Sequence, residues 1–467
     1  NNAYFSYGGD WGDTVTDLDF CGNGLLYADG TMSAKMAEAK KVLQNFQFTS
    51  LGDSRYQVSN EFYSTPLSDF ELDYEVQADG STVHTGTIDL ECMPQASAQF
   101  TVNVPADFDV YPDTQVFLNL YVRLKQDTAW GLKSSDVVAW EQFPLAMSVN
   151  TAKNSKTLQL PQVENQTDDV ILSGEEHSVR ISKATGLITA YQYHGRDVFT
   201  QAPALNYMRA PISNDYSGDY YIYNSAYAAV LQNTQSQWQM DAAGAIVKTE
   251  ADRVTVTFNG TIPAAGNSPC SIIYTVRGDG SVEIQNSFTP DQSITGIIPR
   301  IGMQMQLAAG MEQVVYYGRG PWACYPDRKA AGMFGLYTTT VDAMFESKYL
   351  RPQDNGNRTD VSFVAVGNDQ GSGILISGSL LNFEAMHYTQ EDLAACSHPY
   401  QLSRMDTVQL NIDGFVRGLG NAICGPQPLD QYVIQKGKTY EYSFRILPYS
   451  SLTDAEELMQ AYQNQAD

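Results

Sequence analysis

An asparagine–glutamate pair is the most direct candidate for catalytic chemistry in this sequence. Asn60-Glu61 combines an amide with a carboxyl group, and many sugar-cleaving barrels present their acid/base in such a pair after a strand. Here the pair lies within alternating apolar and polar residues, a pattern typical of a small β-sandwich. A structural role is therefore favoured over a catalytic one.

Histidines and cysteines, the other residue types that often catalyse reactions or bind metals, are widely separated in this sequence. No G-x-S-x-G, H-E-x-x-H or P-loop motif occurs. The cysteines form no C-x-x-C pair, which predicts free thiols in a reducing compartment instead of a zinc site or a disulfide framework. Each histidine is interpreted as a surface or packed residue. The residues concerned are His84, His177, His194, His387 and His398, and Cys21, Cys92, Cys270, Cys324, Cys396 and Cys424.

Tyrosines are concentrated between positions 216 and 227, and two interpretations of them stay open. Aromatic faces stack on the C–H-rich faces of sugar rings, which would make the stretch a sugar-binding surface. Tyrosines at a packed surface with solvated hydroxyl groups explain it equally well. The residues are Tyr216, Tyr220, Tyr221, Tyr223 and Tyr227.

The charge of the chain narrows its possible partners. The 467 residues include 28 Lys and Arg and 53 Asp and Glu, for a net charge of −25. An acidic body of this kind repels phosphate groups, which argues against nucleic acid and anionic membranes, whereas a neutral sugar meets no such penalty. No apolar run approaches the ~20 residues of a membrane-spanning helix.

The pattern of apolar residues predicts one helix, a small sandwich and a long β-region. The helix has an apolar face made of Met32, Met36, Ala39, Leu43 and Phe46. From about residue 47 the period changes to two, with a hairpin at Asp79-Gly80 and a polar linker over 150–168. Strands then dominate to about residue 450. A capping box of Thr453 and Glu456 begins a closing helix.

The first residues carry no processing signal. The sequence begins with Asn1 and has no basic segment followed by an apolar one, as a signal peptide would. We therefore expect a processed, truncated or excerpted piece, and the free thiols favour a cytoplasmic location.

Several segments resemble the C-terminal part of the β-galactosidases of glycoside hydrolase family 2. The resemblance covers nearly the whole chain in the family's order, except for about the last 17 residues. The segments are Tyr7–Asp13, Asp19–Leu25, Thr128–Trp130, Ala139–Phe143, Arg209–Pro211 with Asn214-Asp215, Gly318–Pro321, Tyr325–Arg328, Asp354–Arg358 and Asn411–Phe415.

The resemblance implies a mainly β chain with five parts. These are the tail of the catalytic (β/α)8 barrel (1–46), an immunoglobulin-like β-sandwich (47–149), a linker (150–168), a large mutarotase-like β-supersandwich (169–450) and a C-terminal helix (451–467).

The implied activity is the retaining hydrolysis of terminal β-D-galactosyl residues, as in lactose. Two carboxyl groups ~5–5.5 Å apart carry out this reaction, and the family has both glutamates on barrel strands upstream of Tyr7. The chain then contains no catalytic residue. It would be a small subunit, a proteolytic product or a cut fragment that completes the site for an upstream barrel or large subunit, in an enzyme expected to be a homo-oligomer.

The resemblance also implies site residues. Phe20 would line the galactose site and give its carbonyl oxygen to Na⁺, and Asn23 would give the ion its amide oxygen, while Mg²⁺ would lie in the missing barrel. In some relatives a loop of the large sandwich brings a tryptophan onto the substrate. The corresponding loop, 418–426, has no tryptophan, which leaves Cys424 as its candidate substrate contact.

The alternative is a free-standing carbohydrate-binding or mutarotase-like module. A mutarotase needs a histidine and a glutamate together in its cleft. His387 or His398 with Glu384 or Glu391 are the candidates, although nothing in the sequence brings them together.

Overall fold

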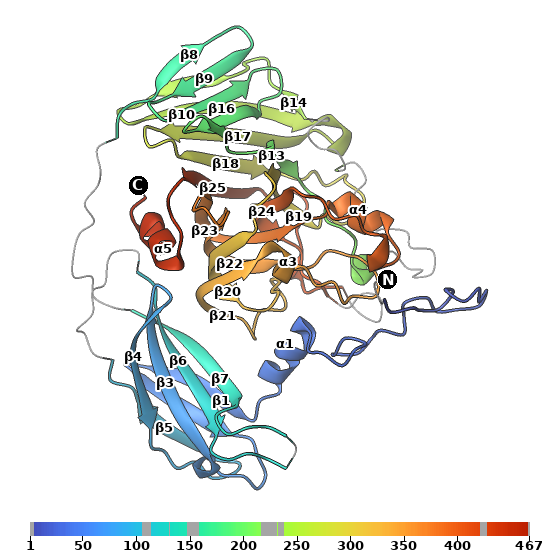
Figure 1. Cartoon of the computed structure of the whole chain (residues 1–467), viewed down its shortest axis with the longest axis vertical. Coiled ribbons are helices and arrows are strands. Elements are labelled where there is room, and N and C mark those ends of the chain that lie inside the picture. Colours follow the sequence, from blue (N-terminus) through green and yellow to red (C-terminus); the bar gives the residue numbers. More distant parts are fainter. Residues whose placement is uncertain are drawn as a thin grey trace. The chain divides into compact units, whose positions relative to one another are not determined.

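Antiparallel β-strands are the main secondary structure of this computed structural model (Figure 1). The chain divides into two units, one formed chiefly by residues 35–155 and the other by residues 156–329 and 337–465 together with the N-terminal segment. The structure describes residues 4–104, 114–129, 131–146, 158–215, 231, 238–420 and 427–465.

The smaller unit is a sandwich of a three-stranded sheet, β1-β2-β5, and a four-stranded sheet, β4-β3-β6-β7. Alternate residues such as Val58, Leu72 and Leu118 are buried between the two sheets. Its elements are α1 (Ala34–Val42), β1 (Phe46–Gly52), β2 (Arg55–Asn60), the 3₁₀ turn Leu67–Asp69, β3 (Phe70–Ala78), β4 (Ser81–Ile88), β5 (Ser97–Thr101), β6 (Val116–Leu124) and β7 (Val137–Leu145).

The predicted hairpin at Asp79-Gly80 joins β3 to β4. Both turn residues have positive φ, 46° and 82°, as a two-residue hairpin of this kind requires. A side chain at Gly80 would also meet the Cβ of Leu336 at 2.3 Å. The turn therefore needs glycine for two independent reasons.

Helix α1 is shorter than the sequence predicts, and its buried face differs. Its buried positions are Ala34, Ala37 and Lys41, whereas Leu43 is 76% exposed and Phe46 already belongs to β1. Lys41 is buried because its ammonium donates to the carboxylate of Glu141 at 2.9 Å. Some of the apolar residues at helical spacing across residues 32–46 therefore lie outside the helix, on either side of it.

A five-stranded sheet opens the larger unit. It has the order β12-β11-β10-β9-β8. Strand β8 lies inside the segment predicted as a linker, so the linker prediction is wrong for those residues, while the other predicted boundaries stay predictions. The strands are β8 (Gln162–Asn165), β9 (Asp169–Ser173), β10 (His177–Ser182), β11 (Ile188–Tyr193) and β12 (Arg196–Asp197).

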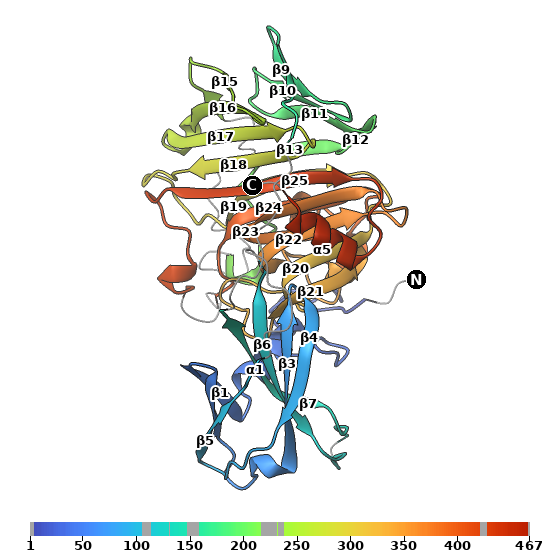
Figure 2. The same cartoon turned by 90° about the vertical axis from the view of Figure 1, so that its left-hand side faces the viewer.

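A thirteen-stranded sheet forms the body of this unit, with the path β13-β19-β24-β23-β25-β18-β17-β16-β14 (Figure 2). β15 pairs with β16, and β20–β22 extend the sheet from β23. The strands are β13 (Gln201–Asn206), β14 (Gln239–Met240), β15 (Ile246–Thr249), β16 (Arg253–Ile262), β17 (Ser268–Arg277), β18 (Val282–Phe288), β19 (Arg300–Leu307), β20 (Gln313–Gly320), β21 (Met333–Thr340), β22 (Arg358–Gly367), β23 (Gly373–Met386), β24 (Val408–Val416) and β25 (Tyr440–Tyr449).

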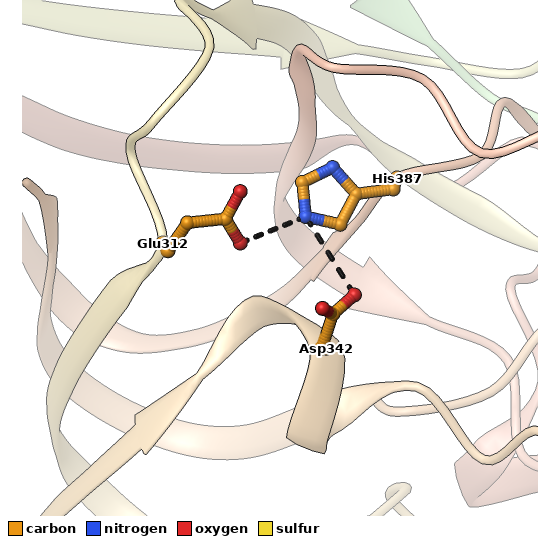
Figure 3. Close-up of side chains that lie close together, drawn as sticks. All are labelled: Glu312, Asp342 and His387. Carbon is orange, nitrogen blue, oxygen red and sulfur yellow. Dashed lines mark hydrogen bonds and ion pairs between the residues drawn. The ribbon is translucent and has the colours of Figure 1, made fainter.

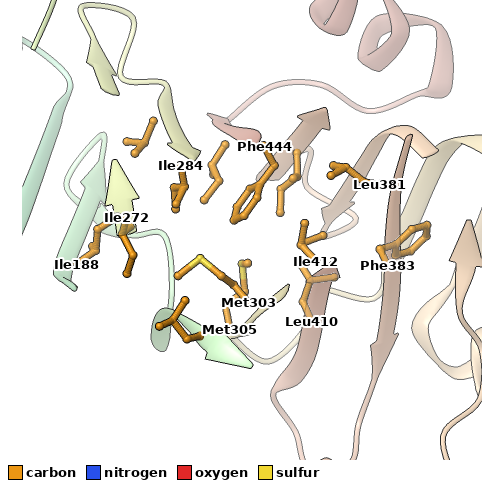
Figure 4. Packing of buried hydrophobic residues seen from close by; sticks show 14 of the residues in the cluster. Ile188, Ile272, Ile284, Met303, Met305, Leu381, Phe383, Leu410, Ile412 and Phe444 are labelled. Atoms are coloured by element: carbon orange, nitrogen blue, oxygen red, sulfur yellow. The ribbon is translucent and has the colours of Figure 1, made fainter. Parts of the chain in front are cut away.

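Alternating apolar residues of these strands form one continuous core. Figure 4 shows Met303 of β19, Ile412 of β24 and Phe444 of β25 in it, all at most 1% exposed. Strands drawn from residues 170 to 446 contribute to this core, so the region folds as one body and not as two small sandwiches.

Short helices lie between the strands of the larger unit, and one follows its last strand. Helix α5 is capped by Asp454, whose side chain accepts a hydrogen bond from the Glu457 amide at 2.9 Å. The predicted cap at Thr453 is therefore wrong by one residue. The helices are α3 (Val341–Met344), α4 (Gln390–Ala395), α5 (Ala455–Gln463) and the 3₁₀ turns Ser213–Asp215, Pro263–Ala265, Pro399–Gln401 and Asp430–Tyr432.

Candidate functional site

The N-terminal segment is held by specific contacts within the larger unit. The Tyr7 hydroxyl donates to the carbonyl of Ser397 at 2.6 Å, and the Tyr7 ring stacks on the His398 ring with centroids 4.3 Å apart. The His398 Nε2 lies 2.9 Å from a carboxylate oxygen of Asp10. The backbone N–H of Tyr7 and the contact with His398 lower the pKa of Asp10.

A second set of contacts fixes the end of the same segment. The Tyr27 hydroxyl donates to a Glu346 carboxylate oxygen at 2.8 Å, and Lys348 forms an ion pair with Asp29 at 2.9 Å. Burial and the nearby Glu346 raise the pKa of Tyr27, so its hydroxyl stays protonated as a donor. Phe20 and Asn23 lie between these two sets of contacts.

Phe20 and Asn23 lie close enough to share one cation. The Asn23 side-chain nitrogen lies 3.1 Å from the Phe20 carbonyl oxygen, and both residues are exposed. Rotating the amide by 180° exchanges its nitrogen and oxygen, which places a second oxygen beside the carbonyl. A backbone carbonyl and an amide oxygen are ligands that suit a hard cation such as Na⁺, so the residues fit the predicted ion.

Cys424 and the tyrosines from Tyr216 to Tyr227 lie outside the described residues. The base of the loop that contains Cys424 is described, and it is firmly held. The carboxylate of Asp327 accepts hydrogen bonds from the amides of Leu419 and Gly420, both at 2.8 Å. The Asn214 amide donates to the Leu419 and Gly420 carbonyls at 3.1 and 2.7 Å.

Two sequence motifs therefore meet at this loop base. Asn214 comes from the Arg209–Asp215 motif, and Asp327 comes from the Tyr325–Arg328 motif. In the first motif, buried Arg209 binds Asp215 at 3.0 and 2.9 Å and donates to the Arg417 carbonyl at 3.0 Å. These residues hold the backbone of residues 417–420, where the loop begins.

A buried guanidinium surrounded by three carboxyl groups lies in the same unit. Arg300 of β19 contacts Asp354 at 2.7 Å, Glu384 of β23 at 2.9 Å and Asp413 of β24 at 3.5 Å. All four side chains are at most 3% exposed. The Tyr325 hydroxyl also donates to Asp354 at 2.8 Å, which connects the cluster to the second motif.

One guanidinium cannot neutralise three buried carboxylates. Burial raises the pKa of Asp413 to about 7 although Arg300 lowers it, and neither Asp413 oxygen has a hydrogen-bond partner among the described residues. Burial and Glu384 likewise raise the pKa of Asp354. The cluster therefore holds protons close to neutral pH.

Asn60 and the two candidate histidines make contacts other than those predicted for a catalytic pair. The Asn60 amide donates to the carbonyls of Thr65 and Cys92 at 2.9 and 3.2 Å. Among the described residues, neither His387 nor His398 is bonded to Glu384 or Glu391: His387 contacts Glu312, and His398 contacts Asp10. The pair that a mutarotase needs is therefore not assembled there.

Cysteine chemistry agrees with the sequence analysis. Each described cysteine is a free thiol, and three of them, Cys92, Cys270 and Cys324, are buried. Burial raises the pKa of Cys270 to about 12, so this thiol is inert.

Comparison with protein families identifies the chain. Residues 173–446 match the family model of the beta galactosidase small chain, which is more than half of the 467 residues. The chain belongs to this family. Residues 56–146 match domain 4 of beta-galactosidase, and residues 1–48 match the TIM barrel domain of the family 2 glycosyl hydrolases. The predicted resemblance and the mainly β fold class are confirmed.

Individual relatives of this family member are longer proteins. A beta-galactosidase of Priestia megaterium is 28% identical over 450 residues, which are 96% of this chain and 43% of that protein. One of Halalkalibacterium halodurans is 27% identical over 453 residues, 95% of this chain and 43% of that protein. The chain thus spans less than half the length of these relatives and matches their C-terminal part.

Among solved structures, a galactose 1-epimerase from Lactobacillus acidophilus superposes with a TM-score of 0.32 and 8% identity, over 62% of this chain and 98% of that one. A likeness of this size is too weak to support a conclusion about this chain.

In the described residues, no helix has both the length and the apolar character needed to cross a membrane.

The raised pKa of Asp413 predicts how the free energy of unfolding depends on pH. Asp413 binds its proton more tightly in the folded state than in the unfolded state, where its pKa is about 3.9. Its contribution to stability is complete below that value and is lost as the pH rises towards 7. Asp413→Asn should therefore flatten the fall of the unfolding free energy between pH 4 and 7, by at most about 1.4 kcal/mol per pH unit.

Urea unfolding of the full chain at several pH values measures this slope. Asp369→Asn, at an exposed position, is the control and should keep the slope of the parent. If the parent and Asp413→Asn have the same slope, Asp413 does not hold a proton in the folded state.

Proposed function

We propose that this chain is the C-terminal portion or small subunit of a β-galactosidase that hydrolyses terminal β-D-galactosyl residues, as in lactose, with retention of configuration. Both catalytic glutamates would lie in an upstream barrel, and this chain would complete the site and its scaffold. The proposal rests on the three family matches, which follow one another along the chain, and on relatives more than twice its length.

The surface of the N-terminal segment is the observation that carries this proposal. Residues 4–34 lie in a chain region that matches the TIM barrel domain of the family 2 glycosyl hydrolases, and many of their large apolar side chains face solvent. Trp11 is 82% exposed and Val15 is 95% exposed. The exposed side chains of this segment are Tyr4, Phe5, Trp11, Val15, Phe20, Leu25, Leu26 and Met32.

Such a concentration of apolar surface indicates a missing partner. The hydrogen bonds of Tyr7 and Tyr27 hold the segment in the larger unit, so its exposed side chains are available to a second body. The remainder of the barrel is the partner whose core they would complete, either as the upstream part of one polypeptide or as a large subunit.

The proposal also covers the bound cations, the location and the oligomeric state of the enzyme. Phe20 and Asn23 would hold Na⁺ together with ligands from the upstream part, and Mg²⁺ would lie in the barrel outside this chain. The complete enzyme would be a cytoplasmic homo-oligomer. The Na⁺ assignment is supported by the 3.1 Å separation of the two ligand groups.

Cys424 would contact the group attached to galactose, at the end of the loop whose base Asp327 and Asn214 hold. Cysteine offers less contact area than tryptophan, so binding of flat aromatic groups should be weak. Slower alkylation of Cys424 in the presence of a galactose-based inhibitor would support this contact, and an unchanged rate would exclude it.

The first prediction concerns activity. The purified chain should leave a chromogenic β-galactoside intact, because a retaining mechanism needs both carboxyl groups. Adding the upstream part should produce hydrolysis, measured as release of the chromophore. Hydrolysis by the chain alone at ordinary enzyme rates would refute the proposal.

The second prediction concerns sodium. In the complete enzyme, Asn23→Ala should raise the KM severalfold and weaken activation by Na⁺, because the ion loses one oxygen ligand. Replacing Na⁺ by a large organic cation should then change the variant little. Cys21→Ala, an exposed neighbour, is the control and should respond to Na⁺ as the parent does. An identical response of Asn23→Ala and the parent would show that Asn23 is no ligand.

A further inference from the structure

Three side chains outside the site described above converge on one point of the larger unit. Figure 3 shows Glu312, Asp342 and His387 facing one another. The His387 Nε2 lies 2.9 Å from Glu312 Oε2 and 3.8 Å from Asp342 Oδ1. One imidazole nitrogen and two carboxylate oxygens, all within 4.8 Å of one another, are the donor set of a metal site.

The backbone holds these three residues in place. Glu312 comes directly before β20, Asp342 lies in α3, and His387 comes directly after β23. The carbonyl of Glu312 accepts a hydrogen bond from the Val341 amide at 3.0 Å, and the carbonyl of His387 accepts one from the Met405 amide at 2.9 Å. The three donor groups are therefore positioned before any ion binds.

The surroundings of the His387 ring point to a cation. Its Nδ1 lies 3.0 Å from the Thr407 carbonyl, to which only an N–H can donate. Its Nε2 faces the two carboxylates, which also accept hydrogen bonds. In the neutral tautomer that donates from Nδ1, the lone pair of Nε2 faces two anionic oxygens, which repel it. A metal ion between them removes this repulsion, and a backbone carbonyl at the second nitrogen is typical of metal-binding histidines.

The charge balance also leaves room for a cation. Arg404 contacts Asp342 from Nε and Nη2, both at 3.2 Å, and Glu312 Oε1 at 3.4 Å. Two carboxylates and one guanidinium leave a net charge of −1 around a neutral imidazole. Arg404 binds Glu312 through Oε1, so Oε2 remains directed at His387. The Asp342 side chain is 66% exposed, which leaves room for water to complete the coordination.

We propose that Glu312, Asp342 and His387 bind one divalent first-row transition cation, with Zn²⁺ as the ion that suits mixed imidazole and carboxylate ligands. The ion would connect the start of β20, helix α3 and the end of β23, and would stabilise this part of the large unit. This site is independent of the catalytic proposal, because it uses none of the residues assigned there.

Co²⁺ is the probe, because its visible absorption reports the type and number of ligands. The full chain, with its accessible thiols alkylated beforehand, is titrated with Co²⁺ alone, and bound metal is measured by equilibrium dialysis. We expect one Co²⁺ per chain, a higher midpoint temperature of unfolding, and at least tenfold weaker binding in His387→Gln and Asp342→Asn.

A second histidine–carboxylate pair provides the matched control. His194 Nε2 lies 3.5 Å from Glu176 Oε2, with no second carboxylate assigned to it by an ion pair in the described residues. His194→Gln should therefore bind Co²⁺ as the parent does. Circular dichroism checks that each variant is folded.

Two results would overturn the proposal. Failure of the parent to bind a stoichiometric Co²⁺ would show that the three side chains form a hydrogen-bonded cluster and not a metal site. Unchanged binding in Asp342→Asn would place the ion elsewhere, and this variant stays informative if His387→Gln does not fold, because Asp342 is largely exposed.

Discussion

The Arg300 guanidinium, enclosed by Asp354, Glu384 and Asp413, is the interaction on which the candidate loop depends most. It joins β19, β23 and β24 to the segment that contains Asp354, in a place with no access to water. Removing one member of such a buried pair costs about 3–5 kcal/mol, because the remaining charge stays uncompensated. Asp354 in turn accepts from Tyr325, two residues before Asp327, which holds the loop base. The buried charges thus support the backbone at Leu419 and Gly420, where this loop begins.

The larger unit combines a complete core with an exposed N-terminal segment that a self-sufficient domain would not need. Its core is continuous and closely packed across the thirteen-stranded sheet. It nevertheless holds an N-terminal segment through Tyr7, Asp10 and Tyr27 whose apolar side chains are left in solvent. Folding of the larger unit alone does not account for this exposed apolar surface, whereas the proposed completion of a barrel would.

The sequence predicted the features that depend on local pattern. The period-two segments became strands, and Asp79-Gly80 became a hairpin turn, since the residue types at these positions determine the backbone. The errors arose where tertiary contacts decide. Two alanines and the Lys41–Glu141 ion pair determine the buried face of α1. Asp454, and not Thr453, is the N-cap of α5.

The candidate site was predictable only in part. Asn214, Asp327, Asp354 and Asp413 stand in the motifs that the resemblance identified, but their hydrogen-bonded roles depend on strands far apart in sequence. Arg300 lies in no quoted motif, and its burial gave no signal, because an arginine in alternating β-sequence usually faces solvent. His387 and Glu312 are 75 residues apart, so only the fold brings them together.

Hydrogen exchange of the chain with and without the upstream part tests the central claim most directly. If the N-terminal segment completes a barrel, amides in residues 4–34 should become protected on mixing, while those of the sandwich core, such as in β17 and β18, should exchange unchanged. Exchange of residues 4–34 that is identical in both samples, under conditions where the two parts form a complex, would contradict the account.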